Sequence, residues 1–364
     1  MEKDTSFQNE QIELETFTVK CDSCGANMGF DPVTQQLKCI HCGFLKDFEK
    51  SNAVEESDIH IALTDASDWG DSVTAYRCDN CGAEVVMPAG HTADKCPYCE
   101  TSHVIKKEDF VGLKPNAVYP FTFKQDDAVS YAKQYVKKRL FAPSKLKKNL
   151  HADNVNGVYQ PGFTFDSKTI SHYQGRIGKR HTRTVGSGKN RRVETYIVWR
   201  YISGVHNDAF DDVFVNADEN YLQSTLDKIL PFNYQTIKVY DDEYLAGFIA
   251  KRYNRNANDC WKDARSMMDS DIKRRILSKY SYDVVDYIKV ATSHSEVTYK
   301  YVLLPIYLVN YKHGTKNYTL HINGNSGKVT GKTPVSAIKV TIAVLLGLVA
   351  LAVLGLLFYN YYLT

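Results

Sequence analysis

The sequence predicts an α+β protein with two small cysteine-rich modules before its main domain and one hydrophobic helix at its C-terminal end. Eight of the nine cysteines lie before residue 100, in pairs with C-x2-C spacing. Residues 340–364 carry no charged side chain. Between these two features, strand-like runs and amphipathic helical patterns follow one another, which is typical of a mixed α+β domain.

Length and composition limit the class of protein. A chain of 364 residues with 43% apolar and 24% charged residues is long enough for two or three units and can bury a core. These values exclude a wholly disordered or collagen-like chain. A net charge of +3 gives no global reason to expect nucleic acid as a partner.

The composition changes along the chain in a way that predicts six segments. The N-terminal stretch is acidic and polar and has no hydrophobic run, so it is not a secretory signal. We expect a disordered tail at 1–19, a first cysteine module at 20–46, a linker at 47–76, a second cysteine module at 77–106, an α+β domain at 107–335 and a transmembrane helix at 337–359.

The two cysteine modules are copies of one sequence unit. The pairs are Cys21/Cys24, Cys39/Cys42, Cys78/Cys81 and Cys96/Cys99. Fourteen residues separate the two pairs within each module, and the second module repeats the first at an offset of 57 residues. The first pair of each module reads C-D-x-C-G-A, so the repeat extends beyond the cysteines.

Four thiolates in two facing C-x2-C turns match the ligand set of structural zinc. We therefore predict two zinc ions, one per module, each held by protein alone and serving to fold a small domain. Disulfides would need an oxidising compartment, and a redox C-x-x-C pair usually stands alone. Iron in a rubredoxin-like site uses the same ligands and stays open as an alternative.

Glycine follows the second cysteine in three of the four pairs, at Gly25, Gly43 and Gly82. Glycine permits the tight turn that directs backbone N–H groups toward the sulfurs. Glu100 takes this position in the fourth pair, so we expect a less regular turn there. The ninth cysteine, Cys260, lies in a helical pattern and is interpreted as a buried thiol.

The main domain is expected to begin with a strand-like run at 119–123 and an amphipathic helix after it. Thr122 and Gln125 have the spacing of a capping box for that helix. Basic residues continue to about residue 148, with no acidic residue between 128 and 152. This segment could contact anionic lipid head groups or nucleic acid phosphates, or it could be a solvated helix face.

The sequence of the rest of the domain predicts antiparallel strands and two helices. We expect a bent strand at 158–166, a hairpin at 182–205 that turns at 186–190, helices at 217–230 and 241–278, and closing strands at 299–311 and 317–322. The G-S-G-K run in the hairpin turn is not a P-loop, because Arg183 replaces the first glycine and Asn190 replaces the serine or threonine.

One polar cluster, formed by His206, Asp208, Asp211 and Asp212, could suggest a metal site or an acid–base pair. A polar loop between strands explains the same residues, and we favour that interpretation. Because no nucleophile, base and orienting residue form a set, we predict that the protein is not an enzyme.

The hydrophobic end has the length of a membrane span. Twenty helical residues at 340–359 extend for about 30 Å, the thickness of the hydrocarbon core of a bilayer. Lys328, Lys332 and Lys339 precede the run, so the positive-inside rule predicts a single-pass protein of the cell membrane with cytoplasmic N-terminal domains. Ala343 and Gly347 form one small-xxx-small pair, which leaves a homo-oligomer open.

The combination of these features resembles a bacterial family of membrane-anchored double zinc-ribbon proteins. They are often labelled TFIIB-type zinc ribbon-containing, and sometimes replication-restart helicase-like or phage-replication-like. The two cysteine modules carry the resemblance, together with the segments 119–121, 244–250, 301–307 and 323–332. The helicase label has no support here, since the chain contains no Walker A motif.

The resemblance implies a role in a membrane-stress assembly, because family members are encoded beside phage-shock-protein-A-like and SPFH-like proteins. The expected function is a non-enzymatic scaffold that docks such partners at the inner face of the bacterial membrane. The alternative is a membrane-tethered nucleic-acid-binding protein acting in replication or transcription.

Overall fold

The computed structural model describes residues 19–51, 53–59, 73–78, 84–88, 104–107, 113–144, 146, 155–313 and 316–363. Residues 1–18 of the tail predicted at 1–19, and the predicted ligands Cys81, Cys96 and Cys99, lie outside these residues. The predicted α+β class is confirmed in its coarse form, with a cysteine cluster near the N-terminus and an apolar C-terminal helix. The bulk of the described structure is a domain built on one large β-sheet, which is more extensive than the sequence suggested.

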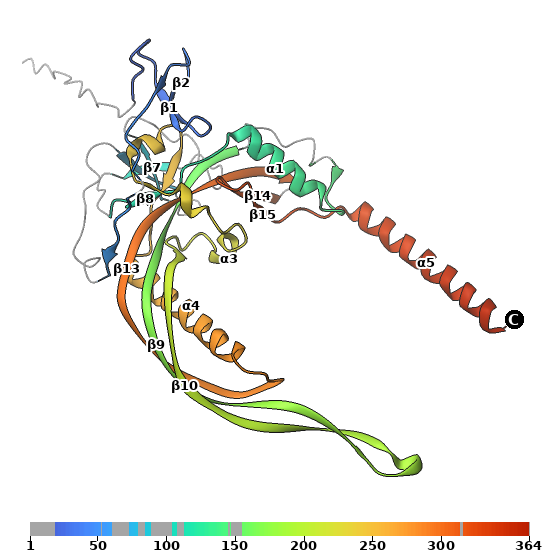
Figure 1. Ribbon diagram of the computed structural model, residues 1–364. Helices are drawn as coiled ribbons and strands as arrows, with labels where there is room; N and C mark the ends of the chain where they lie inside the picture. The colour runs from blue at the N-terminus through green and yellow to red at the C-terminus, as the bar shows by residue number, and fades with distance from the viewer. Residues whose placement is uncertain are drawn as a thin grey trace, which may run out of the picture.

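Three very long strands form the centre of this sheet. β9 (Val155–Val185) pairs antiparallel with β13 (Val284–His313) on one edge and with β10 (Arg192–Asn216) on the other. At about 3.3 Å per residue, the 31 residues of β9 extend for about 100 Å. The three strands run from the body of the molecule into a long curved arm (Figure 1).

The burial pattern of β9 separates the body from the arm. Almost every residue from Val155 to Phe165 is buried, as expected for a strand covered on both faces. From Asp166 to Ile177, buried and exposed residues alternate, as expected where only one face is covered. The predicted strand at 158–166 is therefore the body half of a much longer element.

Shorter strands complete the sheet around these three. β8 (Ala117–Val118), β12 (Ile249–Lys251) and β14 (Lys316–Asn323) pair directly with β13 or β9. The remaining members are β4 (Ser57–Asp58), β5 (Val73–Cys78), β6 (Glu84–Pro88), β7 (Val104–Lys107), β11 (Lys238–Val239) and β15 (Val329–Gly331). β12 pairs with both β9 and β6, so the described strands on either side of Cys81 join the main sheet.

Two helices cover the sheet. α1 (Gln125–Lys137) buries Ala128, Ala132 and Val136 against the body. α4 (Ala257–Ser278) buries residues at four-residue spacing along one side, namely Cys260, Ala264, Met268, Ile272 and Ile276. α4 lies along the concave side of the arm (Figure 1), which explains why one face of β9 is buried there.

The arm bends away from the body where two β-bulges face each other across β9. The register shifts between Phe210 and Val213 in β10 and between Ser295 and Thr298 in β13. Both shifts flank the same stretch of β9, residues 165–168. A bulge bends its strand and increases the local twist, so two bulges at one level redirect the whole three-stranded sheet.

Several local expectations are corrected by the structure. The N-cap of α1 is Lys124, whose backbone N–H donates to Asp127 Oδ2 at 3.3 Å, so the predicted Thr122/Gln125 capping box is wrong. The predicted helix at 217–230 is reduced to α3 (Gln223–Leu226). The first part of the predicted helix at 241–278 is a 3₁₀ turn, η5 (Asp242–Leu245), followed by the strand β12. The apolar residues of that part fit a helical period. They are buried in the body core from a 3₁₀ turn, a short link and a strand instead of from one face of a helix.

The hairpin and the closing strands are confirmed. β9 and β10 turn at residues 186–191, where Gly186 and Gly188 have φ values of +92° and +61°. The final strands β13 and β14 are joined around residues 314–315 and lead through β15 to α5 (Ala337–Leu363). In Figure 1, α5 projects away from the body as a single long helix.

A crowded glycine in the body tests this packing. At Gly162, an added Cβ would lie 2.1 Å from Phe214 Cε2, whereas at Gly29 the nearest atom would be Ala246 O at an ordinary 3.7 Å. We expect Gly162→Ala to lower the free energy of unfolding of the full chain in detergent by about 1–3 kcal/mol. Gly29→Ala should change it by less than about 1 kcal/mol. Equal effects in denaturant unfolding would contradict the packing around Phe214.

Candidate metal centre

The first cysteine module consists of two matching turns, each ending in a glycine. Cys21 N–H donates to Ala26 O and Gly25 N–H donates to Cys21 O, both at 2.8 Å. In the second turn, Cys39 N–H donates to Phe44 O at 2.8 Å and Gly43 N–H donates to Cys39 O at 3.1 Å. Gly25 and Gly43 have φ values of +73° and +77°, the left-handed region that favours glycine.

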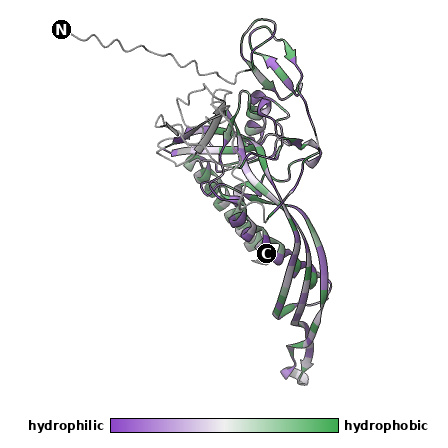
Figure 2. Ribbon diagram, turned by 90° about the vertical axis from the view of Figure 1, so that its left-hand side faces the viewer, coloured by the Kyte–Doolittle hydropathy of each residue, from purple (hydrophilic) through white to green (hydrophobic). Residues whose placement is uncertain are grey.

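A short antiparallel sheet holds these turns face to face. β1 (Met28–Asp31) leaves the first turn and pairs with β2 (Gln36–Cys39), which enters the second turn and pairs with β3 (Leu45–Lys46). Met28 pairs directly with Cys39 across this sheet. The three strands lie at the opposite end of the molecule from the arm tip (Figures 1 and 2).

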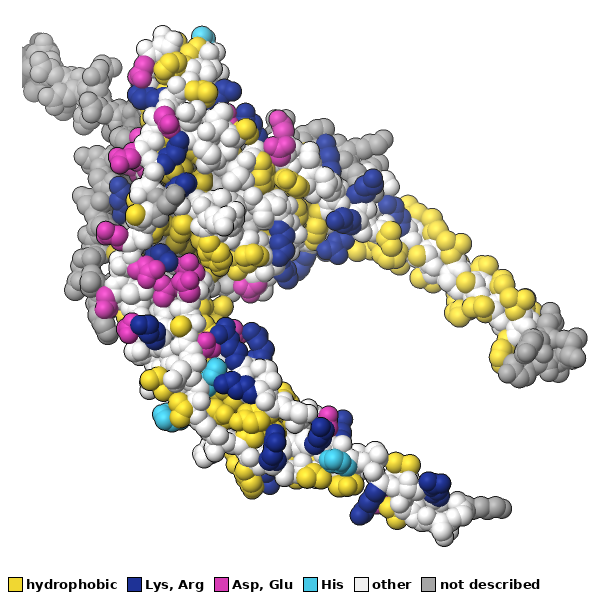
Figure 3. Space-filling view, viewed as in Figure 1, with side chains coloured by type: hydrophobic (Ala, Val, Ile, Leu, Met, Phe, Trp, Pro, Cys, Tyr) yellow, Lys and Arg dark blue, Asp and Glu magenta, His cyan; other side chains and the backbone are white. Residues whose placement is uncertain are grey.

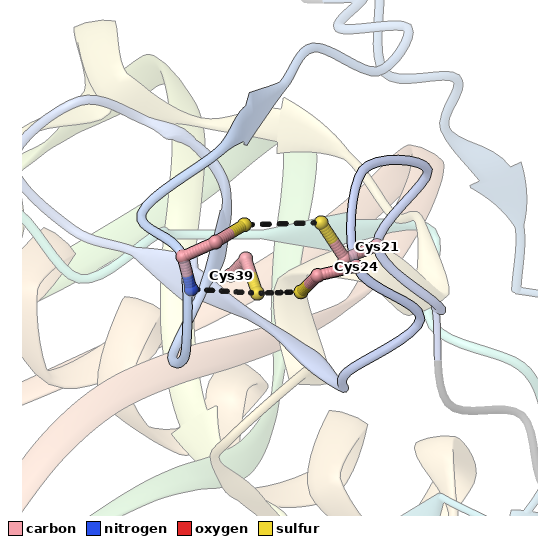
Figure 4. Close-up of side chains that lie close together, drawn as sticks. Cys21, Cys24 and Cys39 are labelled. Atoms are coloured by element: carbon pink, nitrogen blue, oxygen red, sulfur yellow. Dashed lines mark hydrogen bonds between the residues drawn. The ribbon is translucent and has the colours of Figure 1, made fainter.

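The four sulfurs of the module converge on one point. Cys21 Sγ lies 3.5 Å from Cys42 Sγ, and Cys24 Sγ lies 3.5 Å from Cys39 Sγ. All four sulfurs lie within 4.8 Å of one another. Figure 4 shows Cys21, Cys24 and Cys39 directed toward each other from the two turns.

These distances fit a tetrahedral metal ion. A zinc ion bound to sulfur at about 2.3 Å requires about 3.8 Å between neighbouring sulfurs. The sulfur–sulfur distances in this module run from 3.5 Å to at most 4.8 Å and so include that value. Cys21 and Cys39 are buried and Cys24 and Cys42 are exposed, so the site lies at the surface of the module with all four positions supplied by protein. The four residues could hold one metal ion, as the sequence predicted for this module.

Backbone N–H groups already favour the thiolate at Cys39. Cys42 N–H and His41 N–H point at Cys39 Sγ at 3.5 and 3.4 Å. The Cys42 N–H is the main cause of a lowered pKa for Cys39, about 6, which outweighs the opposing effect of burial. At Cys24, the Ala26 N–H lowers the pKa, but hydrogen bonds with the thiols of Cys42 and Cys39 outweigh it and raise the pKa to about 12. Four sulfurs this close would be deprotonated together only around a cation.

The module is anchored to the body through Phe30. The Phe30 ring packs edge-to-face against Tyr244 and Phe248, with centroid distances of 5.3 and 6.4 Å. Phe30 N–H donates to Ala246 O at 2.9 Å, so β1 is tied to the segment that follows η5. Asp31, which is buried, pairs with Lys124 at the start of α1 at 3.4 Å. The metal-binding turns therefore have a fixed position on the large domain.

The second cysteine module is described only in part. Cys78 is buried at the end of β5 and pairs with Val104 of β7. Its predicted co-ligands Cys81, Cys96 and Cys99 lie outside the described residues, so the second zinc ion stays a prediction.

Cys260 occupies the position expected for it. Its side chain is fully buried on α4, and burial is the main cause of a pKa raised to about 12. The thiol points at Asn216 O at 3.7 Å. A thiol that stays protonated in this setting is a packing residue rather than a nucleophile.

The predicted polar loop at 206–212 is wrong, because these residues lie within β10. His206 and Asp208 face α4, where Arg275 binds Asp208 at 2.7 Å. Asp211 and Asp212 lie in the bulge of β10, and Asp212 has a positive φ of 54°. The sequence could not separate the two pairs, since the bulge that divides them depends on pairing with β9.

The bulge assembles a charged cluster that the sequence did not reveal. Lys300 Nζ lies 2.7 Å from Asp212 Oδ1, 2.9 Å from Glu56 Oε1 and 3.9 Å from Asp166 Oδ2. Asp212 N–H also donates to Asp166 Oδ1 at 2.6 Å. Neighbouring members of this cluster are at least 46 positions apart in the chain, and no local pattern connects them.

Asp166, Asp211 and Asp212 are close enough to hold a cation, but Lys300 already supplies a positive charge there. Burial is the main cause of a pKa of about 7 for Asp166, and the neighbouring Glu56 raises it further. Burial also favours neutral Lys300, but its hydrogen bonds with Asp212 and Glu56 outweigh this and raise its pKa. The cluster therefore joins β10, β9, β13 and the 53–59 segment by internal ion pairs.

Comparison with known proteins gives one distant relative. The chain is 29% identical over 322 residues to an uncharacterized protein of Bacillus subtilis (strain 168), YdjG, an alignment that covers 88% of this chain and 91% of that protein. No family model matches the chain, and no solved structure matches it.

Removal of one thiolate tests the metal centre. We expect Cys39→Ser to lower the zinc content of the purified full chain by one ion, because three remaining sulfurs cannot close the tetrahedron. Cys260→Ser is the matched control and should keep the full content. Metal analysis by mass spectrometry measures both. An unchanged content in Cys39→Ser would contradict the site.

The charged cluster can be tested by pH. Since the pKa of Asp166 is raised above the unfolded value of about 3.9, the folded state binds more protons between pH 4 and 7, and this group stabilises the fold less as pH rises through that window. Lys300→Gln removes the compensating cation. We expect this substitution to lower the free energy of unfolding by about 2–4 kcal/mol at pH 8. This is somewhat less than for a fully buried pair, because Glu56 is partly exposed.

That loss should be smaller at pH 5, where Asp166 takes up a proton and carries less negative charge. Lys289→Gln, an exposed lysine of the same strand, is the control and should cost less than about 0.5 kcal/mol at both values. Denaturant unfolding in detergent measures the differences from the unaltered chain at each pH. A loss that is larger at pH 5 than at pH 8 would contradict the assignment.

Proposed function

We propose that this chain is a membrane-anchored, non-enzymatic scaffold that docks cytosolic partners at the inner face of a bacterial membrane. The observation that carries the proposal is the combination of an unburied apolar helix with a long projecting arm. None of the helix span is buried in the protein, and the face of the arm opposite α4 exposes apolar side chains. Both offer contact surface to something outside the chain.

α5 is the proposed anchor. Residues Ala337–Phe358 are long and apolar enough to cross a membrane, with a mean hydropathy of 2.9, and none of the span is buried in the protein. A helix that is apolar all round is stable in water only when something covers it. With Lys328, Lys332 and Lys339 on its N-terminal side, we propose insertion that leaves the body in the cytoplasm.

The cysteine modules are proposed as structural zinc ribbons with two ions per chain. A site with four protein thiolates leaves no open position for water or substrate, which favours a folding role over catalysis. The first module is rigidly attached through Phe30 and can present a fixed surface beside the body.

The arm is the proposed docking surface. Its convex face, opposite α4, exposes apolar side chains at Trp199, Tyr201 and Val205, which are 39, 72 and 55% exposed. Arg176 on the same face stacks over Trp199 at 5.0 Å and binds Asp286 at 2.7 Å. Aromatic residues and arginine are enriched where proteins bind proteins. From the family resemblance, we propose SPFH-like or phage-shock-protein-A-like partners.

A second candidate, nucleic acid binding, is favoured by the charge of the arm tip. Residues 172–201 contain eight lysines and arginines and one acidic residue, Glu194. Beyond α4 the tip is a two-stranded ribbon, a form that can enter a nucleic acid groove. The basic side chains of the tip could donate hydrogen bonds to the phosphate groups of a nucleic acid. The exposed apolar face of the arm has no use in that role, so we rank it second.

The test is a pull-down of the solubilised full chain from its own cells, together with a variant that carries Tyr201→Ser and Val205→Ser. We expect the chain to fractionate with membranes, and SPFH-like or phage-shock-like proteins to be recovered with it. The arm variant should lose at least tenfold of that recovery. Met267→Ser, an apolar side chain exposed on α4, is the control and should lose none.

Other outcomes would overturn the proposal. Recovery of nucleic acid with replication or transcription proteins, lost on nuclease treatment and on neutralising the arm-tip arginines, would favour the second candidate. A soluble full chain would remove the anchor, and unchanged recovery by the arm variant would remove the arm as the docking surface.

A further inference from the structure

An open cavity of about 1010 Å³ lies between α1, β14, β15 and the segment around α3. Four cationic side chains line it, each from a different segment: Arg139, Lys228, Lys316 and Lys332. None of the lining residues is acidic. Within the described part of the chain, none of the four cations forms an ion pair, so no carboxylate of the protein neutralises them.

The walls of the cavity are held in place by hydrogen bonds. Tyr135 Oη donates to Gly331 O at 2.8 Å, which ties α1 to β15. Arg139 donates to Tyr135 Oη at 2.7 Å and stacks over its ring at 4.8 Å. The guanidinium is therefore oriented before any ligand arrives. The hydroxyl group of Thr225 also lines the cavity and can donate to an anion, whereas Thr319 Oγ1 donates to Asn310 Oδ1 at 2.7 Å.

The remaining titratable group in the wall does not add a charge. His321 lines the cavity, and its Nδ1 lies 2.6 Å from Tyr221 Oη. Burial lowers the pKa of His321 to about 4, so the ring is neutral near pH 7. The positive field of the cavity is that of the three lysines and the arginine.

The cavity lies beside the base of α5. Ser336 N–H donates to Phe141 O at 2.8 Å, and Lys339 Nζ donates to Ala142 O at 2.6 Å. Lys332 is five residues before Ala337, a distance of at most about 18 Å along the chain. Figure 3 shows lysine and arginine side chains gathered where α5 leaves the body.

Exposed apolar side chains lie close to the cavity and to the start of α5, as expected at a membrane interface. Leu140, which follows Arg139, is 80% exposed, and Phe141 is 42% exposed. Ile338 at the start of α5 is 73% exposed. Exposed apolar groups next to a cationic cavity at the start of a membrane span would lie where acyl chains meet phosphates.

From this placement we infer that the cavity binds the phosphate head group of an anionic phospholipid. The volume is at the upper end of the range of small-molecule pockets, enough for a phosphate and its polar substituent. Four cations in a lining without acidic residues favour an anionic over a zwitterionic lipid. The inference rests on the proposed insertion of α5 for its source of ligand, but the cavity itself does not depend on the docking partners.

The test uses the full chain in a nonionic detergent, titrated with dioctanoyl phosphatidylglycerol, dioctanoyl phosphatidylcholine or inorganic phosphate. We expect one phosphatidylglycerol per chain, bound at least tenfold more tightly than phosphatidylcholine. Lys228→Gln combined with Lys316→Gln should weaken this binding about 25-fold, from about fivefold per cation.

The matched control is Lys133→Gln combined with Lys137→Gln. Both lysines are exposed on α1 and lie outside the cavity lining. This double variant should change the affinity for phosphatidylglycerol less than about threefold. An equal loss in both double variants would reduce the effect to general surface charge and overturn the site. Thermal unfolding and zinc content of each variant establish that it is folded.

Two further results would also overturn the inference. Equal affinity for phosphatidylglycerol and phosphatidylcholine would remove the selectivity for anions. Inorganic phosphate binding as tightly as phosphatidylglycerol would assign the cavity to a soluble phosphate compound instead of a lipid. The titration does not require α5 to span a membrane, so its failure is distinct from a failure of anchoring, which cell fractionation detects.

Discussion

The pairing of β9 on both of its edges is the constraint on which the rest of this structure depends. β13 and β10 follow β9 over most of its 31 residues, so the three strands form one continuous ribbon through body and arm. In the body both faces of the ribbon are covered, and in the arm only α4 covers it. The strands β4, β8, β12 and β14 pair directly with this ribbon, and the helices α1 and α4 pack against it.

The direction of the arm is set where the ribbon carries charge into its interior. Two bulges flank residues 165–168 of β9, and Lys300 joins Asp212, Glu56 and Asp166 at that level. A bulge without this cation would leave several carboxylates facing each other in a partly buried space. The ion pairs and the bend therefore support each other, which explains how an exposed three-stranded arm keeps one orientation relative to the body.

The two ends of the body have different chemistry. At one end, Phe30 and Asp31 fix the cysteine turns beside α1, so a metal ion held by the four sulfurs would stabilise the surface next to it. At the other, the end of α1 meets the base of α5, and cations gather around a cavity without acidic partners. In the scaffold role proposed above, the cysteine module, the projecting arm and the apolar helix would each offer a separate contact surface.

The sequence by itself determined the features that depend on spacing. The first four cysteine ligands, their glycine turns, the hairpin at Gly186 and the apolar C-terminal helix follow from local patterns, and the structure has them. Tertiary structure decided the rest. Apolar residues at 244–250 fit a helical period but form a 3₁₀ turn and a strand. The strand forms because residues 249–251 pair with β9 and β6 of the main sheet. The Lys300 cluster and the cationic cavity join distant segments, and only the pairing of β9 and the packing of α1 bring those segments together.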